Sequence, residues 1–409
     1  MAIDDLGATR EPTWRLRSEG RRGRENPVVK SAEFAFLATG IVGIDKGGVE
    51  SAARYIYQKL LSDAYTPRTW RTHPLHICPP EPYSAADPLN EATLNWIFLI
   101  SSLNFSFWSE MEGGRPYRYG VEWREGWNID KTEIHTGYWS LVAALDRALE
   151  EGIPITDPTF YSSAEKCPDS MIEYIFRPAA QSTEVIPLLQ ERISIMREVG
   201  SILCRDFQGS FKRFVDEFHR RTNSCGTAIQ LVQMVTDTFP SFQDETWLNG
   251  RKVYIWKRAQ ILVAETWAAF YPPTADMVHP IFPGPAGPVI GELTMFADYR
   301  VPQILHHLRI LSYPPALIQT LEAGVPLVSG SREEISIRTA SIVAVERVRE
   351  EITRLRRDQK SMEGEEVSSV LIDFYLWDLA KDIETGSVKV EGIKTTTMVA
   401  PHRTRSIWY

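Results

Sequence analysis

The sequence predicts an all-α protein, mostly helical with minor β-structure, that folds as a single large domain. Three observations support this class. Apolar residues recur at the three- and four-residue spacing of buried helix faces throughout the chain, strand-like alternation is confined to short segments, and no clean linker interrupts the pattern. The domain is expected to run from residue 31 to residue 409.

Residues 1–30 are predicted to form a flexible, Arg-rich leader. Six arginines lie between Arg10 and Arg24 with acidic residues among them, a mixture that is unlike a transit peptide. The first residues also lack the basic segment and apolar core of a secretory signal. A solvated leader is the simplest interpretation, because chain ends are usually loose unless other contacts hold them.

The first half of the domain is predicted to contain one β-hairpin among its helices. Apolar and aromatic residues alternate at Tyr119, Val121 and Trp123, which predicts a hairpin within 115–135. The helix before Gly152 should stop there, because glycine commonly follows a helix end. Helices in this half are expected at 48–62, 90–103, 137–151, 185–205, 208–221 and 226–238.

The second half holds the two strongest helical patterns. In the segment 254–270, Ile255, Leu262 and Val263 fall on one face. In the segment 333–357, acidic residues open the pattern and arginines close it, which suits the dipole of a helix. Shorter helices are expected at 299–311, 315–323 and 366–381, and a short terminal strand at 403–409.

Composition narrows the class of function. The 409 residues carry 53 acidic and 45 basic side chains, a net charge of −8, which argues against bulk binding of duplex nucleic acid while leaving room for a local basic pocket. No apolar stretch is long enough to cross a membrane. Four widely spaced cysteines fit a reduced protein, so we expect a cytoplasmic location, with the nucleus as the alternative.

The usual cofactor and metal motifs are missing from the sequence. It contains no phosphate-binding glycine loop, no Gly-x-Ser-x-Gly and no His-Glu-x-x-His. His73 and His76 are spaced to chelate a metal, but apart from Cys78 no acidic or cysteine cluster accompanies them, so ordinary loop histidines are the better interpretation. We therefore predict no metal site.

Three segments combine aromatic rings with carboxylates, at 103–110, 295–302 and 373–378. Such segments suit a flat, polar heteroaromatic ligand, because rings stack on a base and a carboxylate accepts paired N–H groups. Core packing is the alternative. Asp298 is also placed to cap a helix, and Asp373 and Asp378 point about 140° apart on a helix, although both could border one pocket.

The chain resembles the queuosine salvage protein family, the queuosine 5′-phosphate N-glycosidases. The similarity runs in order through most of residues 50–409 and departs at Glu265, where the family often has Asp, and in the Pro/Gly-rich segment 271–291. The first 45 residues have no clear counterpart. The matching blocks are 103–110, 137–141, 147–156, 209–211, 257–264, 294–303, 376–378, 401–403 and 407–409.

The resemblance implies an all-α fold related to helix-hairpin-helix DNA glycosylases. It implies hydrolysis of the N-glycosidic bond of queuosine 5′-monophosphate, which releases queuine for salvage into tRNA modification. The family is not known to need a metal or organic cofactor. The implied partner is the small nucleotide, with no stable nucleic acid and no membrane.

The resemblance also implies roles for site residues. Asp373 is the predicted catalytic carboxylate beneath the ribose C1′, and a first-turn helix acid is the alternative for it. Asp298 is expected to accept from the edge of the base, Phe296 to line its ring and His73 to contact the queuine side. Asp378 is expected to face the cationic secondary amine of queuine.

The remaining candidates are less distinguished by the sequence. Trp377 and Tyr375 are predicted pocket walls, and core packing is the alternative for each. Lys257, Arg258 and Arg300 are candidates for the 5′-phosphate, and structural ion pairs are the alternative. Two other functions stay open at this point: a DNA-repair glycosylase of helix-hairpin-helix type, and a non-catalytic protein that binds queuine or the nucleotide.

Overall fold

The computed structural model describes residues 26–110, 117–274, 277–282, 290–358 and 366–409, so most of the predicted leader lies outside the described residues. The fold is mostly helical, with 54% helix and 7% strand, as predicted.

The first helix, α1 (Pro27–Thr39), packs along α13 (Arg332–Asp358). Residues 27–30, predicted as leader, therefore belong to the folded domain. Asn26 caps α1 through its side chain, with Pro27 in the first helical position.

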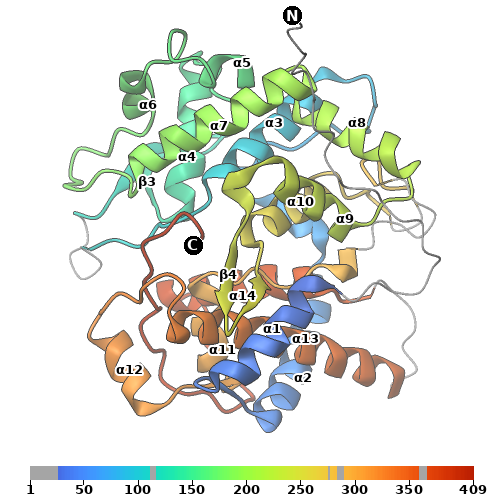
Figure 1. Cartoon of the computed structure of the whole chain (residues 1–409), viewed down its shortest axis with the longest axis vertical. Coiled ribbons are helices and arrows are strands. Elements are labelled where there is room, and N and C mark those ends of the chain that lie inside the picture. The colour runs from blue at the N-terminus through green and yellow to red at the C-terminus, as the bar shows by residue number, and fades with distance from the viewer. Residues whose placement is uncertain (1–25, 111–116, 275–276, 283–289, 359–365) are drawn as a thin grey trace, which may run out of the picture.

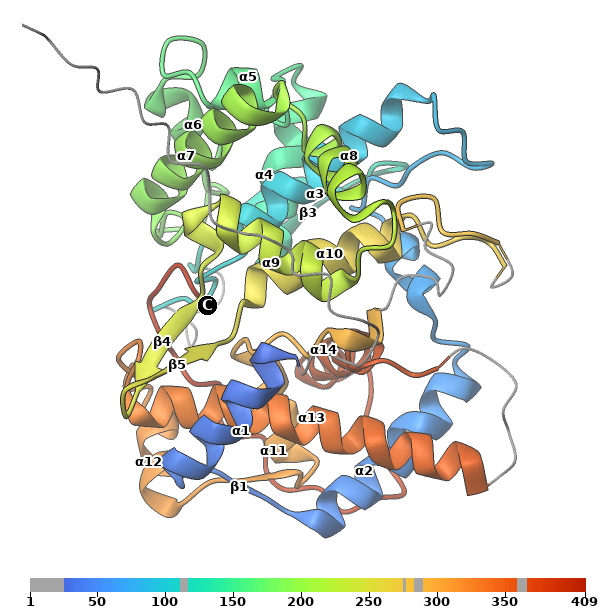
Figure 2. The ribbon, with the colours of Figure 1, turned by 45° about the vertical axis from the view of Figure 1, so that its right-hand side comes forward.

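The helices form two halves, one above the other in Figures 1 and 2. The upper half contains α3 (Pro88–Leu103), α4 (Tyr138–Glu150), α5 (Pro158–Tyr161), α6 (Asp169–Ile175), α7 (Leu189–Phe207), α8 (Phe211–Thr222), α9 (Ala228–Thr238) and α10 (Lys257–Ala269). The lower half contains α1, α2 (Lys46–Ser62), α11 (Arg300–His307), α12 (Pro315–Glu322), α13 and α14 (Ser369–Thr385). Short 3₁₀ turns are η1 (Pro67–Thr72), η2 (Pro240–Phe242) and η3 (Ile290–Glu292).

Helix α10 is the centre of the upper half. Every residue from Lys257 to Ala269 is buried, and the helix packs against α3, α9 and η1. A helix enclosed on all sides is usually apolar all round, but this one includes Lys257, Arg258 and Glu265. The charged residues that it nevertheless carries must then find partners or line a cavity.

Every predicted helix has a counterpart, but several predicted limits were wrong by three or four residues, and the backbone explains two of them. The predicted helix 299–311 ends at His307, since Arg309 has a positive φ of 61° and Leu311 pairs with Ile44. The predicted helix 254–270 starts only at Lys257, because Trp256 also has a positive φ, of 50°. A left-handed residue breaks the helical hydrogen-bond ladder in both places.

The strands of the described part of the chain form three antiparallel pairs. The predicted hairpin is confirmed as β2 (Gly120–Gly126) with β3 (Ile129–Thr136). The others are β1 (Gly43–Ile44) with β6 (Leu311–Ser312) and β4 (Glu245–Leu248) with β5 (Arg251–Tyr254). The β4–β5 hairpin was not predicted, although its Asn249-Gly250 turn, with both φ angles positive, is a strong hairpin signal.

The predicted strand at 403–409 was wrong. The segment is ordered but irregular, because its backbone bonds to the loop around Ser106 and Trp108. Ser406 N donates to Ser106 Oγ at 3.1 Å, and Trp108 Nε1 donates to the Thr404 carbonyl at 3.1 Å. In the described residues, no helix has the length and apolarity needed to cross a membrane.

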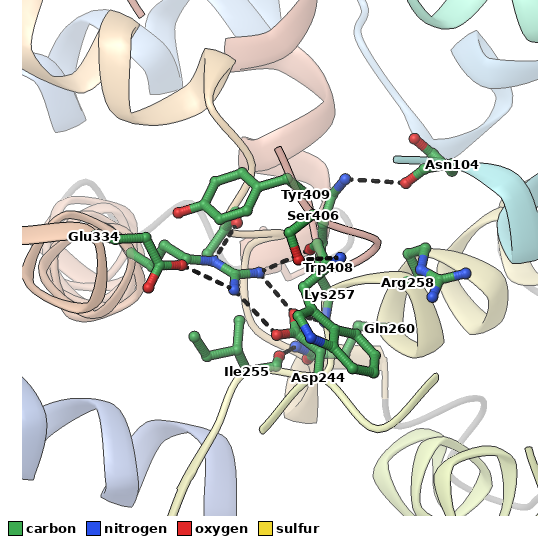
Figure 3. A network of polar contacts seen from close by, with 12 residues as sticks. Asn104, Asp244, Ile255, Lys257, Arg258, Gln260, Glu334, Ser406, Trp408 and Tyr409 are labelled. Carbon is green, nitrogen blue, oxygen red and sulfur yellow. Dashed lines mark hydrogen bonds and ion pairs between the residues drawn. The ribbon is translucent and has the colours of Figure 1, made fainter. Parts of the chain in front are cut away.

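A buried ion pair ties α13 to the start of α10 (Figure 3). Arg338 on α13 donates to both oxygens of Asp244, at 3.0 and 2.6 Å, and its guanidinium lies 4.5 Å from the ring centre of Tyr409. Asp244 in turn accepts from the backbone N–H of Lys257 at 3.2 Å. Glu334 adds a second carboxylate to Arg338, at 3.4 Å. The network fixes where α10 begins relative to the lower half.

We expect Asp244→Ala to lower the free energy of unfolding by about 3–5 kcal/mol, because it leaves most of a buried guanidinium charge unpaired. Chemical denaturation of wild type and variant measures the difference. The control is Asp216→Ala, which breaks an exposed i,i+4 pair with Lys212 and should cost less than about 1 kcal/mol. Equal destabilisation by the two substitutions would contradict the role of the network.

Candidate active site

A pocket of about 320 Å³ opens between the two halves of the fold. The upper half contributes residues of α4 and α10, and the lower half contributes α14 and the segment 296–300 that leads into α11. The turn η1 and the residues after it form a further wall. Segments far apart in the chain thus meet at one cavity.

All of the predicted site residues except Tyr375 and Arg258 line this pocket. Tyr375 is buried and packs edge-on against Tyr65, with ring centres 5.5 Å apart. It lies two positions after Asp373 on α14 and therefore points to the opposite side of the helix. The predicted residues that line the pocket are His73, Lys257, Phe296, Asp298, Arg300, Asp373, Trp377 and Asp378.

Arg258, a candidate for the phosphate, does not line the pocket. Its side chain is buried on a different face of α10, where the guanidinium donates to the carbonyls of Ser102 and Ser241. Its position directly after Lys257 turns it about 100° away from the pocket. Arg258 therefore has a structural role, although its partners are backbone carbonyls rather than the ion-pair partner that was its alternative.

Asp373 lies at the floor of the pocket. Its side chain is buried, and Oδ1 accepts a hydrogen bond from the Phe296 backbone N–H at 2.8 Å. Because α14 begins at Ser369, Asp373 stands in the second turn, so the alternative of a first-turn helix acid does not hold. Burial, together with the nearby carboxylate of Asp298, raises the pKa of Asp373 well above its usual value.

Asp298 caps a helix, as the sequence suggested, and it also lies at the pocket. Its Oδ1 accepts from the backbone N–H groups of Arg300 and Val301, each at 2.8 Å, and so caps the first turn of α11. The residue also lines the pocket. Burial raises the pKa of Asp298, and the cationic Lys257 opposes that rise.

Lys257 supplies a positive charge at the same floor. It is the first residue of α10, it is buried, and its Nζ donates to the Asn104 carbonyl at 3.2 Å. Burial lowers the pKa of Lys257 to about 8, while Asp298 favours its charged form. The floor therefore combines two carboxylates with one ammonium group.

Asp378 occupies a separate part of the pocket wall. Its Oδ2 accepts a hydrogen bond of 2.5 Å from the hydroxyl of Tyr65. Burial raises the pKa of Asp378 to about 6. A cation bound beside this carboxylate would lower its pKa, because a nearby positive charge favours the ionised form.

Aromatic rings form the other walls. Trp377 lies edge-on to Trp139, with ring centres 5.8 Å apart, and the ring of His73 stacks on Trp139 at 3.5 Å. Burial lowers the pKa of His73 to about 4, so the ring is neutral near pH 7. His76 stacks on Trp70, and its Nδ1 pairs with the Trp70 carbonyl. No cluster of three or more metal-ligating side chains occurs in the parts of the chain that the structure covers.

Glu265 lines the pocket too, although in the sequence it stands out only as a departure from the family pattern. Ser101 Oγ and Tyr138 OH donate to its two oxygens, each at 3.3 Å. Lys257, Ile261 and Glu265 follow one another at four-residue spacing and all line the pocket. Charged residues at that spacing in an otherwise apolar helix are the signal that could have found this face.

Glu265 should make the protein less stable as the pH rises. Burial raises its pKa from 4.5 to about 7. Between these values the folded state binds a proton that the unfolded state has lost, so the free energy of unfolding should fall with increasing pH, by up to about 3 kcal/mol. Glu265→Gln removes this contribution and should be more stable than wild type at about pH 8.

Denaturation at several pH values measures the effect. The difference between Glu265→Gln and wild type should grow between about pH 5 and pH 7 and then level off. Glu350→Gln, at an exposed position on α13, is the matched control and should track wild type. A difference that is independent of pH would show that Glu265 does not titrate in this range.

Comparison with known proteins gives a consistent result. The family model described as "Queuosine salvage protein" matches residues 84–409. A relative from Schizosaccharomyces pombe is 37% identical over 386 residues, covering 93% of this chain and 99% of the relative. One from Mus musculus is 35% identical over 381 residues, covering 93% and 98%. One from Sphaerobacter thermophilus is 36% identical over 319 residues, covering 78% and 82%. All three are named queuosine 5′-phosphate N-glycosylase/hydrolase.

Proposed function

The chain belongs to the queuosine salvage protein family, and we propose that it hydrolyses the N-glycosidic bond of queuosine 5′-monophosphate and releases queuine for salvage into tRNA modification. The observation that carries the proposal is the buried carboxylate of Asp373 at the floor of a pocket lined with aromatic rings. The substrate is inferred from the name that the relatives share, and the side chains of the pocket suit that substrate.

The reaction needs stabilisation of a cationic ribosyl group. Queuine is a 7-deazaguanine, so its leaving group has no N7 lone pair that an acid could protonate. As the bond from C1′ to the base breaks, positive charge develops on the ribose, and the carboxylate of Asp373 stabilises it. Water then bonds to C1′, and its proton leaves with the base nitrogen.

Other pocket residues recognise the base. Asp298 accepts from the N1–H and exocyclic amine of the deazaguanine edge, for which its second oxygen, Oδ2, is suited while Oδ1 caps α11. Phe296 lines the ring, and His73, backed by Trp139, contacts the queuine side. Asp378 faces the secondary ammonium group, and Trp377 forms a wall. Tyr375 does not line the pocket itself but packs against Tyr65, which does, and so supports that wall.

The scaffold and location complete the proposal. The helical architecture supports a relation to helix-hairpin-helix DNA glycosylases. The four cysteines are free thiols, which supports a reducing compartment such as the cytoplasm. The net charge of −8 supports a small-nucleotide substrate over duplex DNA.

Chromatography of released base tests the function. Purified protein is incubated separately with queuosine 5′-monophosphate, with queuosine, with guanosine monophosphate and with duplex DNA that contains a damaged base. Queuine from queuosine 5′-monophosphate, with no guanine from guanosine monophosphate, is the expected result. Binding of the nucleotide without release on long incubation would favour a non-catalytic binding protein. Release of a damaged base from duplex DNA would favour a repair glycosylase, and either outcome overturns the proposal.

A further inference from the structure

A short irregular segment after α3 reaches the pocket. Residues 104–109 belong to no helix or strand, and Asn104 and Phe107 line the cavity. The carbonyl of Asn104 accepts the hydrogen bond that Lys257 Nζ donates at 3.2 Å (Figure 3). The position of the ammonium at the floor therefore depends on where this stretch of backbone lies.

Buried cations hold the neighbouring carbonyls. The side chain of Arg192 on α7 is fully buried, donates to the carbonyls of Leu103 and Phe105, and lies 4.2 Å from the ring centre of Phe105. Arg258 on α10 donates to the Ser102 carbonyl. Because the last carbonyls of a helix have no partner within it, these cations complete the end of α3 and hold the backbone that leads to the pocket.

The segment 402–409 holds a later residue of the loop, Ser106. Its Oγ donates to the Ser406 carbonyl at 2.8 Å and accepts from the Ser406 N–H at 3.1 Å, while the Ser106 N–H donates to the Tyr409 carbonyl. Ser106 is fully buried and has a positive φ of 50°. A residue other than glycine keeps such a conformation only where its surroundings hold it, and the two-way bond with Ser406 contributes to that.

The segment 402–409 is also attached to the lower half of the fold. Arg338 on α13 donates to the Trp408 carbonyl at 3.2 Å, and its guanidinium packs on the ring of Tyr409. Ser106 therefore connects a wall of the pocket to the lower half. It does so two residues from the carbonyl that binds Lys257.

We propose that Ser106 is a positioning residue for the reaction. By binding the Ser406 backbone, its hydroxyl keeps the Asn104 carbonyl against the ammonium of Lys257, and so keeps that charge facing the acids of the floor. This inference rests on the proposed function, in which the catalytic carboxylate must be ionised.

Charges of both signs surround the ammonium of Lys257. They are Asp298, Asp373, Asp244, Arg338 and Arg258. The carboxylates favour the charged form of the lysine and the guanidinium groups oppose it. A carbonyl that accepts from the ammonium also favours the charged form, and it fixes the direction of the N–H group. Losing that carbonyl should therefore lower the pKa of Lys257 below its value of about 8 and leave its charge less well placed.

The pH profile of Ser106→Ala tests the role. We expect kcat/KM for queuosine 5′-monophosphate near pH 7 to fall by about tenfold, the loss typical of a hydrogen bond to a charged group. The acidic limb should move to higher pH, because a displaced ammonium favours the ionised carboxylate less. An unchanged profile would overturn the inference.

Ser336→Ala is the matched control. It removes another fully buried hydroxyl, which accepts from the Val42 N–H at 3.0 Å and does not line the pocket. We expect a lower melting temperature in both variants but a wild-type pH profile in Ser336→Ala. If the control loses activity as Ser106→Ala does, the loss reflects general destabilisation and the positioning role is wrong.

Two further variants locate the effect. On the Lys257→Met background, Ser106→Ala should cause little further loss, because its effect passes through the lysine; losses that multiply would contradict the inference. Ser106→Gly adopts the positive φ without strain but lacks the hydroxyl, so it should behave as Ser106→Ala. Wild-type activity in Ser106→Gly would show that the backbone conformation suffices and would overturn the role of the hydroxyl.

A measurement without substrate separates this inference from the proposed function. In protein labelled with ¹³C-lysine, the NMR signal of Lys257, assigned by its loss in Lys257→Met, should titrate about one pH unit lower in Ser106→Ala than in wild type. Equal titration in the two proteins would overturn the inference whatever the activity. If wild type releases no queuine, the proposed function fails, and the titration still decides whether Ser106 positions the lysine.

Discussion

Replacing Asp373 with asparagine should lower kcat for queuosine 5′-monophosphate by ~100-fold or more, because it removes the charge that stabilises the ribosyl cation. The fold should survive. Asparagine keeps an oxygen that can accept from the Phe296 N–H, and the substitution removes a buried carboxylate whose raised pKa reports an unfavourable environment for its charge. The melting temperature should therefore be equal to or above that of wild type.

Single-turnover release of queuine, the melting temperature and queuine binding together measure this prediction. Asp382→Asn is the matched control, because it makes the same chemical change on α14 at an exposed position that does not line the pocket. A variant at position 373 that keeps more than about a tenth of the wild-type rate would remove Asp373 from the catalytic role. A lost rate with a lower melting temperature and lost binding would point to a structural role instead.

Local sequence patterns predicted most of the helices, because the apolar period reports which face of a helix is buried. They failed where one residue changes the backbone. Trp256 and Arg309 adopt positive φ angles that break a helix inside a continuous apolar pattern. The segment 403–409 has strand-like residues, yet its partner is a loop some 300 positions away rather than another strand. Neither outcome follows from neighbouring residues alone.

The residues of the candidate site were predicted mainly from the resemblance to a family. How the fold brings them together could not be predicted from the sequence. Lys257, Asp298 and Asp373 meet only because the two halves of the fold pack together. Burial sets the raised pKa values of the carboxylates, and burial is a tertiary property. Glu265 and Lys381 also line the pocket and were missed for the same reason, because each looks like an ordinary helix charge until its surroundings are known.

The ammonium of Lys257 should keep the floor of the pocket active near neutral pH. Asp373 must be ionised to stabilise a cation, and burial beside Asp298 opposes its ionisation. Lys257 is the cation that favours the charged forms of both acids. Lys257→Met should therefore raise the pKa of Asp373 further and lower kcat/KM near pH 7 by ~100-fold.

The dependence on pH distinguishes this role from simple contact with substrate. A raised pKa moves the acidic limb of the rate profile to higher pH, so Lys257→Met should regain activity as the pH rises, whereas Asp373→Asn should not recover at any pH. Lys389→Met should keep the wild-type profile, because its charge lies outside the pocket. If Lys257→Met loses activity by the same factor at every pH, the lysine contacts the substrate directly and does not control the charge of Asp373. Because the Lys257 backbone is held by Asp244, a partial shift of the same kind is expected for Asp244→Ala, which would link the buried ion pair to the chemistry at the floor.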